Sequence, residues 1–278
     1  MRVGVIAGGG PLPVAVVQGA RQAGHAARVA QIAGEGDPAR FPTGSDVQSF
    51  PVAAFGAYTR WFKSEGVTHV CLAGTVSRPD FASLKPDMKG LKYLPRVVRA
   101  ARDGDDALLR ALIGALEAES FMVIPPQDLV ANLLAREGVL GRVEVPPGAR
   151  GDILKACTVA REMGRLDIGQ AAVVCDGVVL AVEAQEGTAA MIARVAELPE
   201  ALRGTPDLRN GVLAKMLKPG QDARVDLPTL GPDTVSACDR AGIAGIVVEA
   251  GRAFILDRAE VIARAEAAGI FLLVLPEA

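Results

Sequence analysis

The sequence predicts an α/β protein of two domains, with a parallel sheet in the first domain and a mixed sheet in the second. Three observations predict this class. At 278 residues the chain exceeds the usual size of one domain. Its first third alternates short apolar runs with helical patterns, which is typical of a parallel sheet. Its second half carries Asp176-Gly177 between two apolar runs, a strong signal for a β-hairpin.

The first domain is expected over residues 1–138. Strands joined by helices imply right-handed crossovers, and hence a Rossmann-like parallel sheet. Ligands of such sheets bind in the loops at the carboxyl ends of the strands. The expected elements are, in order, strand 3–7, helix 14–23, strands 27–32 and 46–50, helix 55–65, strand 67–73, a helical region 91–119 interrupted at Pro95 and at Gly104-Asp105-Asp106, and strand 121–124.

The second domain is expected over residues 151–278, as a mixed α/β domain. Residues 139–150 are interpreted as the linker, because they combine glycine with tandem prolines and lack periodicity. The expected elements are helix 151–163, strands 171–175 and 178–183, helix 188–197, strand 211–216, helix 234–241, strands 243–249 and 253–256, helix 258–268 and strand 271–275.

Composition and charge exclude several classes of protein. The 30 basic and 32 acidic residues give a net charge of −2, and we expect no nucleic-acid partner because that needs a clustered basic excess. No apolar run is long enough to span a membrane, and the N-terminus does not resemble a signal peptide. The four separated cysteines predict reduced core residues of a cytoplasmic protein. His25 and His69 are interpreted as structural, which argues against histidine-based hydrolases.

The first candidate site is the glycine-rich turn Gly8-Gly9-Gly10, between a predicted strand and a predicted helix. Its backbone N–H groups could bind an anion at the helix N-terminus. The turn does not match the dinucleotide pattern of three spaced glycines, and strand 27–32 ends in Ala33-Gly34 without an acidic residue suited to a ribose. The residues leave open whether this turn contacts a ligand or only reverses the chain.

Polar side chains also follow strand 67–73, where Thr75, Ser77 and Arg78 come directly after Gly74. An arginine can bind a phosphate through two hydrogen bonds, although a capped turn explains the same residues equally well. Asp105, in the pair Asp105-Asp106, allows two similar interpretations, a helix cap and a contact with metal or substrate.

The most charged segment of the second half is 218–231. If it is extended, Asp222, Arg224 and Asp226 share one face, because side chains alternate along a strand. An acid–base–acid face suits a divalent metal beside a phosphate, and the alternative is an edge strand with a solvated charged face.

Further oxygen and nitrogen groups of the second half would complete such a site. Hard oxygen ligands select Mg²⁺ or Mn²⁺ over zinc, and Mg²⁺ takes only one or two protein carboxylates beside phosphate. The additional oxygen ligands are Asp167, Glu183 and Glu186, and the cations that would offset phosphate charge are Lys215, Lys218 and Arg224.

Taken together, these motifs resemble the LpxI family, the UDP-2,3-diacylglucosamine pyrophosphatases of lipid A synthesis in Gram-negative bacteria. The resemblance runs nearly end to end, and the combination is specific although each motif alone is not. Family members often have Asn where this chain has Thr75. The residues that carry the resemblance are 6–10 with 12–13, 73–79, 104–109, 164–170, 181–188 and 224–228.

The resemblance implies a cytoplasmic, Mg²⁺-dependent hydrolase that converts UDP-2,3-diacylglucosamine to UMP and 2,3-diacylglucosamine 1-phosphate, also called lipid X. It implies a central catalytic role for Asp226. From the residues themselves we expect Asp222 to assist in catalysis, and Asp226, Asp167, Glu183 and Glu186 to bind the metal. The resemblance leaves open a homodimer and a peripheral contact with the inner membrane. The expected substrate-binding residues are Gly9, Gly10, Leu12, Thr75, Val76, Ser77, Arg78, Asp105, Gly169, Gln170, Gln185, Gly187, Thr188, Lys215, Lys218 and Arg224.

Two alternatives from other classes stay open. A non-catalytic protein that binds nucleotide-sugars or glycolipid phosphates would show affinity without metal-dependent hydrolysis. A nucleotide-sugar transferase would need an acceptor and would release pyrophosphate or UDP rather than UMP.

Overall fold

The computed structural model describes residues 1–77, 80–81, 83–102, 104–219 and 227–277. The mixed α/β class is confirmed, and the chain divides into two compact units, Met1–Asn132 and a second unit that begins at Leu133. Among the described residues, no helix is long and apolar enough to cross a membrane. All four cysteines are buried and form no disulfide, and burial raises the pKa of each thiol.

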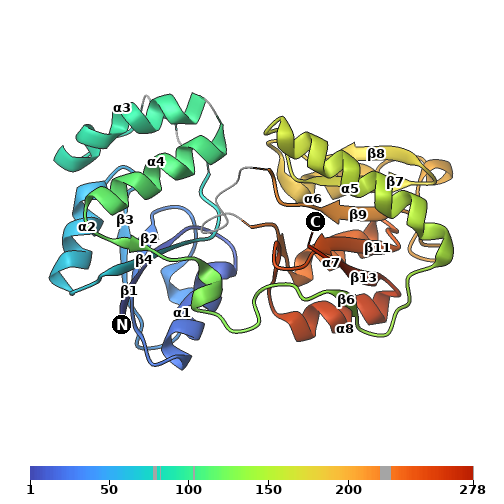
Figure 1. The fold of residues 1–278 in the computed structure, drawn as a ribbon, viewed down its shortest axis with the longest axis horizontal. Helices are drawn as coiled ribbons and strands as arrows, with labels where there is room; N and C mark the ends of the chain where they lie inside the picture. The colour runs from blue at the N-terminus through green and yellow to red at the C-terminus, as the bar shows by residue number, and fades with distance from the viewer. Residues whose placement is uncertain (78–79, 82, 103, 220–226, 278) are drawn as a thin grey trace. The chain divides into compact units, whose positions relative to one another are not determined.

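The first unit is built on a five-stranded sheet in which every neighbouring pair is parallel (Figure 1). The strand order is β3-β2-β1-β4-β5, which confirms the predicted Rossmann-like sheet. The order reverses between β1 and β4, where sheets of this kind bind their ligands. The strands are β1 (Arg2–Ala7), β2 (Ala26–Ile32), β3 (Asp46–Phe50), β4 (His69–Ala73) and β5 (Met122–Val123).

Helices cover both faces of this sheet, because its central strands are apolar on both sides. Val5 of β1 packs with Val16 of α1 on one face. Its neighbour Ile6 points the opposite way and packs with Phe62 of α2 and Leu116 of α4. The helices are α1 (Leu12–Gln22), α2 (Phe55–Ser64), α3 (Met88–Arg102) and α4 (Asp105–Ala118).

The second unit contains a six-stranded mixed sheet of order β6-β13-β11-β9-β7-β8. Strand β11 is parallel to both of its neighbours, whereas β6, β7 and β8 run antiparallel to theirs. The predicted hairpin at Asp176-Gly177 is confirmed, since it joins β7 to β8. The strands are β6 (Gly138–Leu140), β7 (Ala171–Cys175), β8 (Val178–Val182), β9 (Val212–Lys215), β11 (Gly245–Glu249) and β13 (Phe271–Leu275), with a separate parallel pair β10 (Thr229–Leu230) and β12 (Phe254–Ile255).

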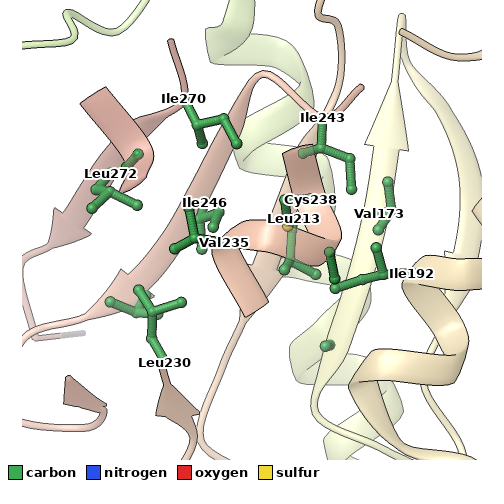
Figure 2. Close-up of a cluster of buried hydrophobic side chains, with 14 of the residues drawn as sticks. Val173, Ile192, Leu213, Leu230, Val235, Cys238, Ile243, Ile246, Ile270 and Leu272 are labelled. Atoms are coloured by element: carbon green, nitrogen blue, oxygen red, sulfur yellow. The ribbon is translucent and has the colours of Figure 1, made fainter. Parts of the chain in front are cut away.

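Two apolar clusters hold this second sheet. One face packs against α6 and α7, and Figure 2 shows Leu213 of β9 and Ile246 of β11 beside Ile192 and Cys238 of these helices. The opposite face packs against α5. The helices of this unit are α5 (Arg150–Arg165), α6 (Gly187–Ala196), α7 (Pro232–Arg240) and α8 (Arg258–Ala268).

The segment 139–150, which was interpreted as a linker, lies within the second unit. Its first residues belong to β6, which pairs with β13 through Val139 and Leu140. The tandem prolines do not mark a free connection, because Pro147 starts a single 3₁₀ turn that leads directly into α5. The boundary between the units therefore comes earlier, between Asn132 and Leu133.

The predicted interruption of the helical region at Pro95 is also wrong, since α3 continues through this residue. A proline removes the N–H that would bind the carbonyl of the residue four positions earlier, here Leu91. Both residues are exposed, so water can take the place of the missing donor.

Candidate functional site

The first candidate site lies at the carboxyl ends of β1 and β4, and we call residues 8–12 and 74–77 the β1/β4 edge. The two predicted loops are joined to each other: Gly9 N–H donates to Thr75 O at 2.6 Å, and Thr75 N–H donates to Gly9 O at 3.2 Å. Only glycine fits at position 8, since a Cβ there would lie 2.2 Å from the Thr75 carbonyl oxygen. The loops that the sequence placed separately thus form one structure.

Backbone donors for an anion are few at this edge. Gly8 N–H donates to Ala73 O at the end of β4, Gly9 N–H donates to Thr75 O, and Pro11 and Pro13 have no N–H. Gly10 is exposed with a φ of 75°, and α1 begins at Leu12. An anion at this helix N-terminus would meet the N–H groups of Gly10 and Leu12, which is a poorer set than a dinucleotide-binding loop offers.

Sequence reasoning missed Arg40, which holds the glycine turn from outside. Its guanidinium donates to Gly10 O at 2.6 Å and also to Gly8 O. A fully buried Gln31 accepts from the same guanidinium at 3.2 Å and donates its amide to Ala7 O at 3.0 Å. Desolvation lowers the pKa of Arg40, and its buried Nε has no hydrogen-bond partner among the described residues.

Glu35 is a second residue that the sequence did not indicate. It follows β2 by three positions, just beyond Ala33-Gly34, where no acidic residue was expected. Its carboxylate accepts from the backbone N–H of Ser77 at 2.9 Å and from the Ser77 hydroxyl at 3.3 Å. Glu35 therefore orders the loop that follows β4, and Thr75, Val76 and Ser77 are all exposed beside it.

The second candidate site lies at one edge of the mixed sheet, and we call residues 167–170, 183–188 and 215–218 the β8/β9 edge. The start of β7 pairs with the end of β9 through Ala171 and Lys215, and Ala172 pairs with Val182 at the end of β8. Antiparallel pairing thus gathers three separate motifs. The predicted residues that meet here are Asp167, Gly169, Gln170, Glu183, Gln185, Glu186, Gly187, Thr188, Lys215 and Lys218.

Glu183 is the buried acid of the β8/β9 edge, at 6 % exposure. Its carboxylate accepts from the Thr188 hydroxyl at 2.6 Å and from the Gln170 backbone N–H at 3.3 Å. Gly169 allows this close approach, since a Cβ there would lie 2.0 Å from the Glu183 carbonyl oxygen. The side-chain oxygen Oε1 of Gln170 is buried and has no hydrogen-bond partner among the described residues.

Two cations lie at the same edge. Lys215 is 6 % exposed and donates to Thr229 O at 2.9 Å. Lys218 pairs with Asp167 at 2.8 Å, and Asp167 adopts a φ of 53° in the turn that follows α5. Side chains alternate along β9, so Lys215 projects on the face of Leu213, which is covered by α6 and α7.

The side chain of Glu186 has partners other than these residues. Its carboxylate pairs with Arg194 of α6 at 2.6 Å and accepts from the Ala184 N–H at 3.2 Å. Hydrogen bonds from its own backbone N–H and from Arg194 lower the pKa of this carboxyl. Glu186 is the N-cap residue of α6, where a carboxylate interacts favourably with the helix dipole. Its contacts therefore fit a structural role better than metal binding.

Comparison with known protein families decides the relationship. Residues 2–133 match the profile described as the LpxI N-terminal domain, and residues 136–273 match the LpxI C-terminal domain. This chain belongs to the LpxI family. The two LpxI domains meet near the boundary between the two structural units, after Asn132. The resemblance predicted from the motifs is confirmed at the level of the family.

A relative in this family comes from Caulobacter vibrioides and is named UDP-2,3-diacylglucosamine pyrophosphatase LpxI. It is 50 % identical over 274 residues, which cover 98 % of this chain and 96 % of the relative. Among solved structures, the CobK precorrin-6A reductase is 11 % identical with a TM-score of 0.33, covering all of this chain and 88 % of its own. The UDP-glucose 4-epimerase of Thermus thermophilus is 16 % identical with a TM-score of 0.32, covering 99 % of this chain and 86 % of its own. Similarity this low carries no argument about function.

Several predicted LpxI site residues lie outside the described part of the chain. They are Arg78, Asp222, Arg224 and Asp226, while α4 begins at Asp105, whose side chain is not described. Within the described ranges, no group of three or more His, Cys, Asp or Glu residues could hold a metal ion. The expected ligands Asp167, Glu183 and Glu186 each accept hydrogen bonds from protein donors instead.

Proposed function

We propose that this chain hydrolyses the pyrophosphate bond of UDP-2,3-diacylglucosamine, releasing UMP and 2,3-diacylglucosamine 1-phosphate. The observation that carries the proposal is the 50 % identity to the relative named for this activity, which extends over 98 % of the chain. The identity covers 96 % of the relative, and both family domains are present in this chain.

The chemistry of the β8/β9 edge supports a phosphate-containing substrate. A buried lysine is costly unless an anion or carbonyl compensates it, and Lys215 has the Thr229 carbonyl close by. Lys218 lies at the same edge, as does the N-terminus of the ten-residue helix α6 with the Thr188 hydroxyl. Cations and helix N-termini both stabilise the negative charge that builds up on phosphate oxygens during hydrolysis.

The proposed roles follow the sequence prediction. Asp226 and Asp222 are proposed as the catalytic carboxylates. The groups proposed to bind the substrate are Lys215, Lys218, Thr188 and Gln170. In this assignment Glu183 fixes the orientation of Thr188 and of the Gln170 backbone, since it accepts hydrogen bonds from both. The β1/β4 edge, with Gly9, Gly10 and Ser77, is proposed to bind another part of the substrate.

Dependence on Mg²⁺ is part of the proposal, with Mn²⁺ as the alternative ion. The described carboxylates alone do not fit a metal site, because their oxygens are engaged by Lys218, Thr188 and Arg194. Any metal would rely on Asp226 or Asp222, and Mg²⁺ commonly takes only one or two protein carboxylates. Homodimerisation likewise stays a prediction.

The test is incubation of the purified full-length protein with UDP-2,3-diacylglucosamine in detergent, with Mg²⁺ or with EDTA, followed by chromatography of the nucleotide products. Release of UMP only with metal is the expected result. UMP release in EDTA would overturn the metal requirement alone. Substrate binding without UMP indicates a binding protein, and release of UDP or pyrophosphate in the presence of an acceptor indicates a transferase.

A matched pair of variants tests the catalytic assignment. Asp226→Ala should reduce kcat by at least about a thousandfold while leaving thermal unfolding unchanged, as loss of a catalytic group does. Asp207→Ala removes an exposed carboxylate of the same domain and should keep full activity. Activity of Asp226→Ala within tenfold of the parent protein would remove this residue from the catalytic role.

A further inference from the structure

Helix α3 of the first unit has a charge unlike the rest of the chain. Its 15 residues contain five cations and no acid, whereas the whole chain has a net charge of −2. The cations are Lys89, Lys92, Arg96, Arg99 and Arg102. Figure 1 shows this helix beside α4 in the first unit. Helix α3 is therefore locally positive in a protein with a slightly negative net charge.

One face of α3 anchors the helix to the unit. Gly90 is buried, and Tyr93 packs edge-on against Phe55 of α2 with ring centroids 5.0 Å apart. The Tyr93 hydroxyl donates to Glu119 at 3.2 Å, and Lys89 pairs with the same carboxylate. These contacts fix the rotation of the helix about its axis, and hence which residues face outward.

The outward face carries cations and large apolar side chains together. Lys92, Arg96 and Arg99 are exposed, and within the described ranges no acidic side chain pairs with any of the three. Met88 is 82 % exposed and Leu91 is 53 % exposed on the first turn of the same helix. Lys92 contacts the neighbouring Tyr93, through its hydroxyl at 3.5 Å and its ring. Exposed Met and Leu side chains beside cations without an acidic partner are a combination that solvent alone does not favour.

The acids that form hydrogen bonds with α3 in the described ranges are already engaged. Asp87 accepts from the backbone N–H groups of Gly56, Ala57 and Gly90, and so caps two helices at once. Glu119 is shared between Lys63 and Lys89. Neither acid neutralises the outward cations, which leaves their charge available to an external anion.

We propose that the outward face of α3 binds the surface of a membrane that contains anionic phospholipids. Charge complementarity carries this choice: Lys92, Arg96 and Arg99 would contact lipid phosphates while Met88 and Leu91 enter the interface. The helix is too short and too charged to cross the bilayer, so it lies on the surface. The inference goes beyond the proposed hydrolysis and does not depend on it, although a diacyl substrate would reside in the same surface.

The experiment is co-sedimentation of the full-length protein with vesicles of phosphatidylcholine alone or with about one third phosphatidylglycerol, at low and high salt. One cation near an anionic surface contributes about 1 kcal/mol, which corresponds to about fivefold in binding. The variant Lys92→Gln, Arg96→Gln, Arg99→Gln should therefore partition about a hundredfold more weakly onto anionic vesicles. The variant Met88→Ser, Leu91→Ser should weaken binding that persists at high salt.

A control with the same change in net charge is Arg142→Gln, Arg240→Gln, Arg264→Gln, which removes three exposed cations of the second unit. It should bind vesicles like the parent protein. Equal loss in this control, or no binding of the parent protein to anionic vesicles at low salt, would overturn the proposal. Binding to heparin or DNA but not to vesicles would instead assign the face to a polyanion partner. Both α3 variants should hydrolyse detergent-dispersed substrate like the parent protein. A negative vesicle-binding result can therefore be distinguished from a failure of the proposed hydrolase function.

Discussion

At both candidate edges, a glycine is required where two segments of backbone approach each other closely. At Gly169 a side chain would meet the Glu183 carbonyl oxygen at 2.0 Å, and backbone cannot move aside as a flexible side chain can. Gly169 thus sets the distance between the chain before β7 and the chain after β8. The hydrogen bonds that Glu183 accepts depend on this distance.

Gly169→Ala should lower the free energy of unfolding by about 3 kcal/mol, the upper part of the range for overpacking. Urea denaturation followed by circular dichroism measures this loss. Gly148→Ala is the matched control, since its Cβ would meet nothing within 4 Å. Equal stability of the two variants would contradict the close approach at Gly169.

Arg40 is a residue whose importance arises only from the folded structure. It contacts Gly10 across 30 positions in the sequence, and it reaches Gln31 on the neighbouring strand β2. The sequence indicated the glycine turn from its composition and its place after a strand. No sequence pattern around Arg40 or Glu35 indicates their role. Both residues bind atoms of loops that are distant in the sequence and become neighbours only through the order of the strands.

Arg40→Ala should destabilise the protein by about 2 kcal/mol, since two carbonyl groups and the Gln31 side chain lose a charged donor. Arg40→Lys should recover only part of this loss, because one ammonium cannot reproduce the planar guanidinium contacts. The exposed Arg60→Ala should change stability by less than about 0.5 kcal/mol. Full recovery by Arg40→Lys in a urea titration would show that charge alone matters at this position.

At the level of elements, sequence patterns predicted most strands and helices but not every boundary. The alternation of elements in the first unit and the Asp176-Gly177 hairpin were visible because they depend on local turn chemistry. Strand β6 was missed, since only three residues form it and its pairing partner β13 lies more than 100 positions later. The metal site stays a prediction, because Asp222 and Asp226 fall outside the described residues.

A small charged network at Glu119, the residue that follows α4, connects this helix to α2 and α3. The Glu119 carboxylate pairs with Lys89 and with Lys63, and its side chain is 11 % exposed. The hydrogen bond from Lys89, followed by that from Lys63, lowers the pKa of Glu119 from 4.5 to about 2. A carboxyl whose pKa is depressed by folding stabilises the protein above its ordinary pKa, and this stabilisation is lost as the pH falls.

Glu119→Gln should therefore reduce the free energy of unfolding by about 1 kcal/mol at pH 7. At this pH the ion pairs of Glu119 with Lys63 and Lys89 are intact, but water partly screens them. The difference from the parent protein should shrink as the pH falls from 4.5 towards 2. Urea denaturation at pH 7, 4 and 3 measures the trend, with the exposed Glu144→Gln as control. A difference that stays constant over this pH range would assign the effect to packing instead of charge.

At the scale of the whole molecule, the apolar cores do not mix residues from the two units. The two clusters of the first unit contain residues up to Val130, and the two clusters of the second unit begin at Ala135. The five-stranded sheet is also complete before Asn132. A unit with its own sheet and core has the properties of a domain that folds alone.

The fragment 1–132 should consequently unfold in a single cooperative transition when it is expressed alone. A shorter fragment, 1–118, lacks β5 together with the buried Phe121, Ile124 and Leu129, and it should lose that cooperativity. Calorimetry and near-ultraviolet circular dichroism distinguish the two outcomes, since fixed aromatic packing gives a near-ultraviolet signal. If fragment 1–132 were disordered while the full chain is folded, the first unit would need the rest of the chain, and the separate cores would not suffice for stability.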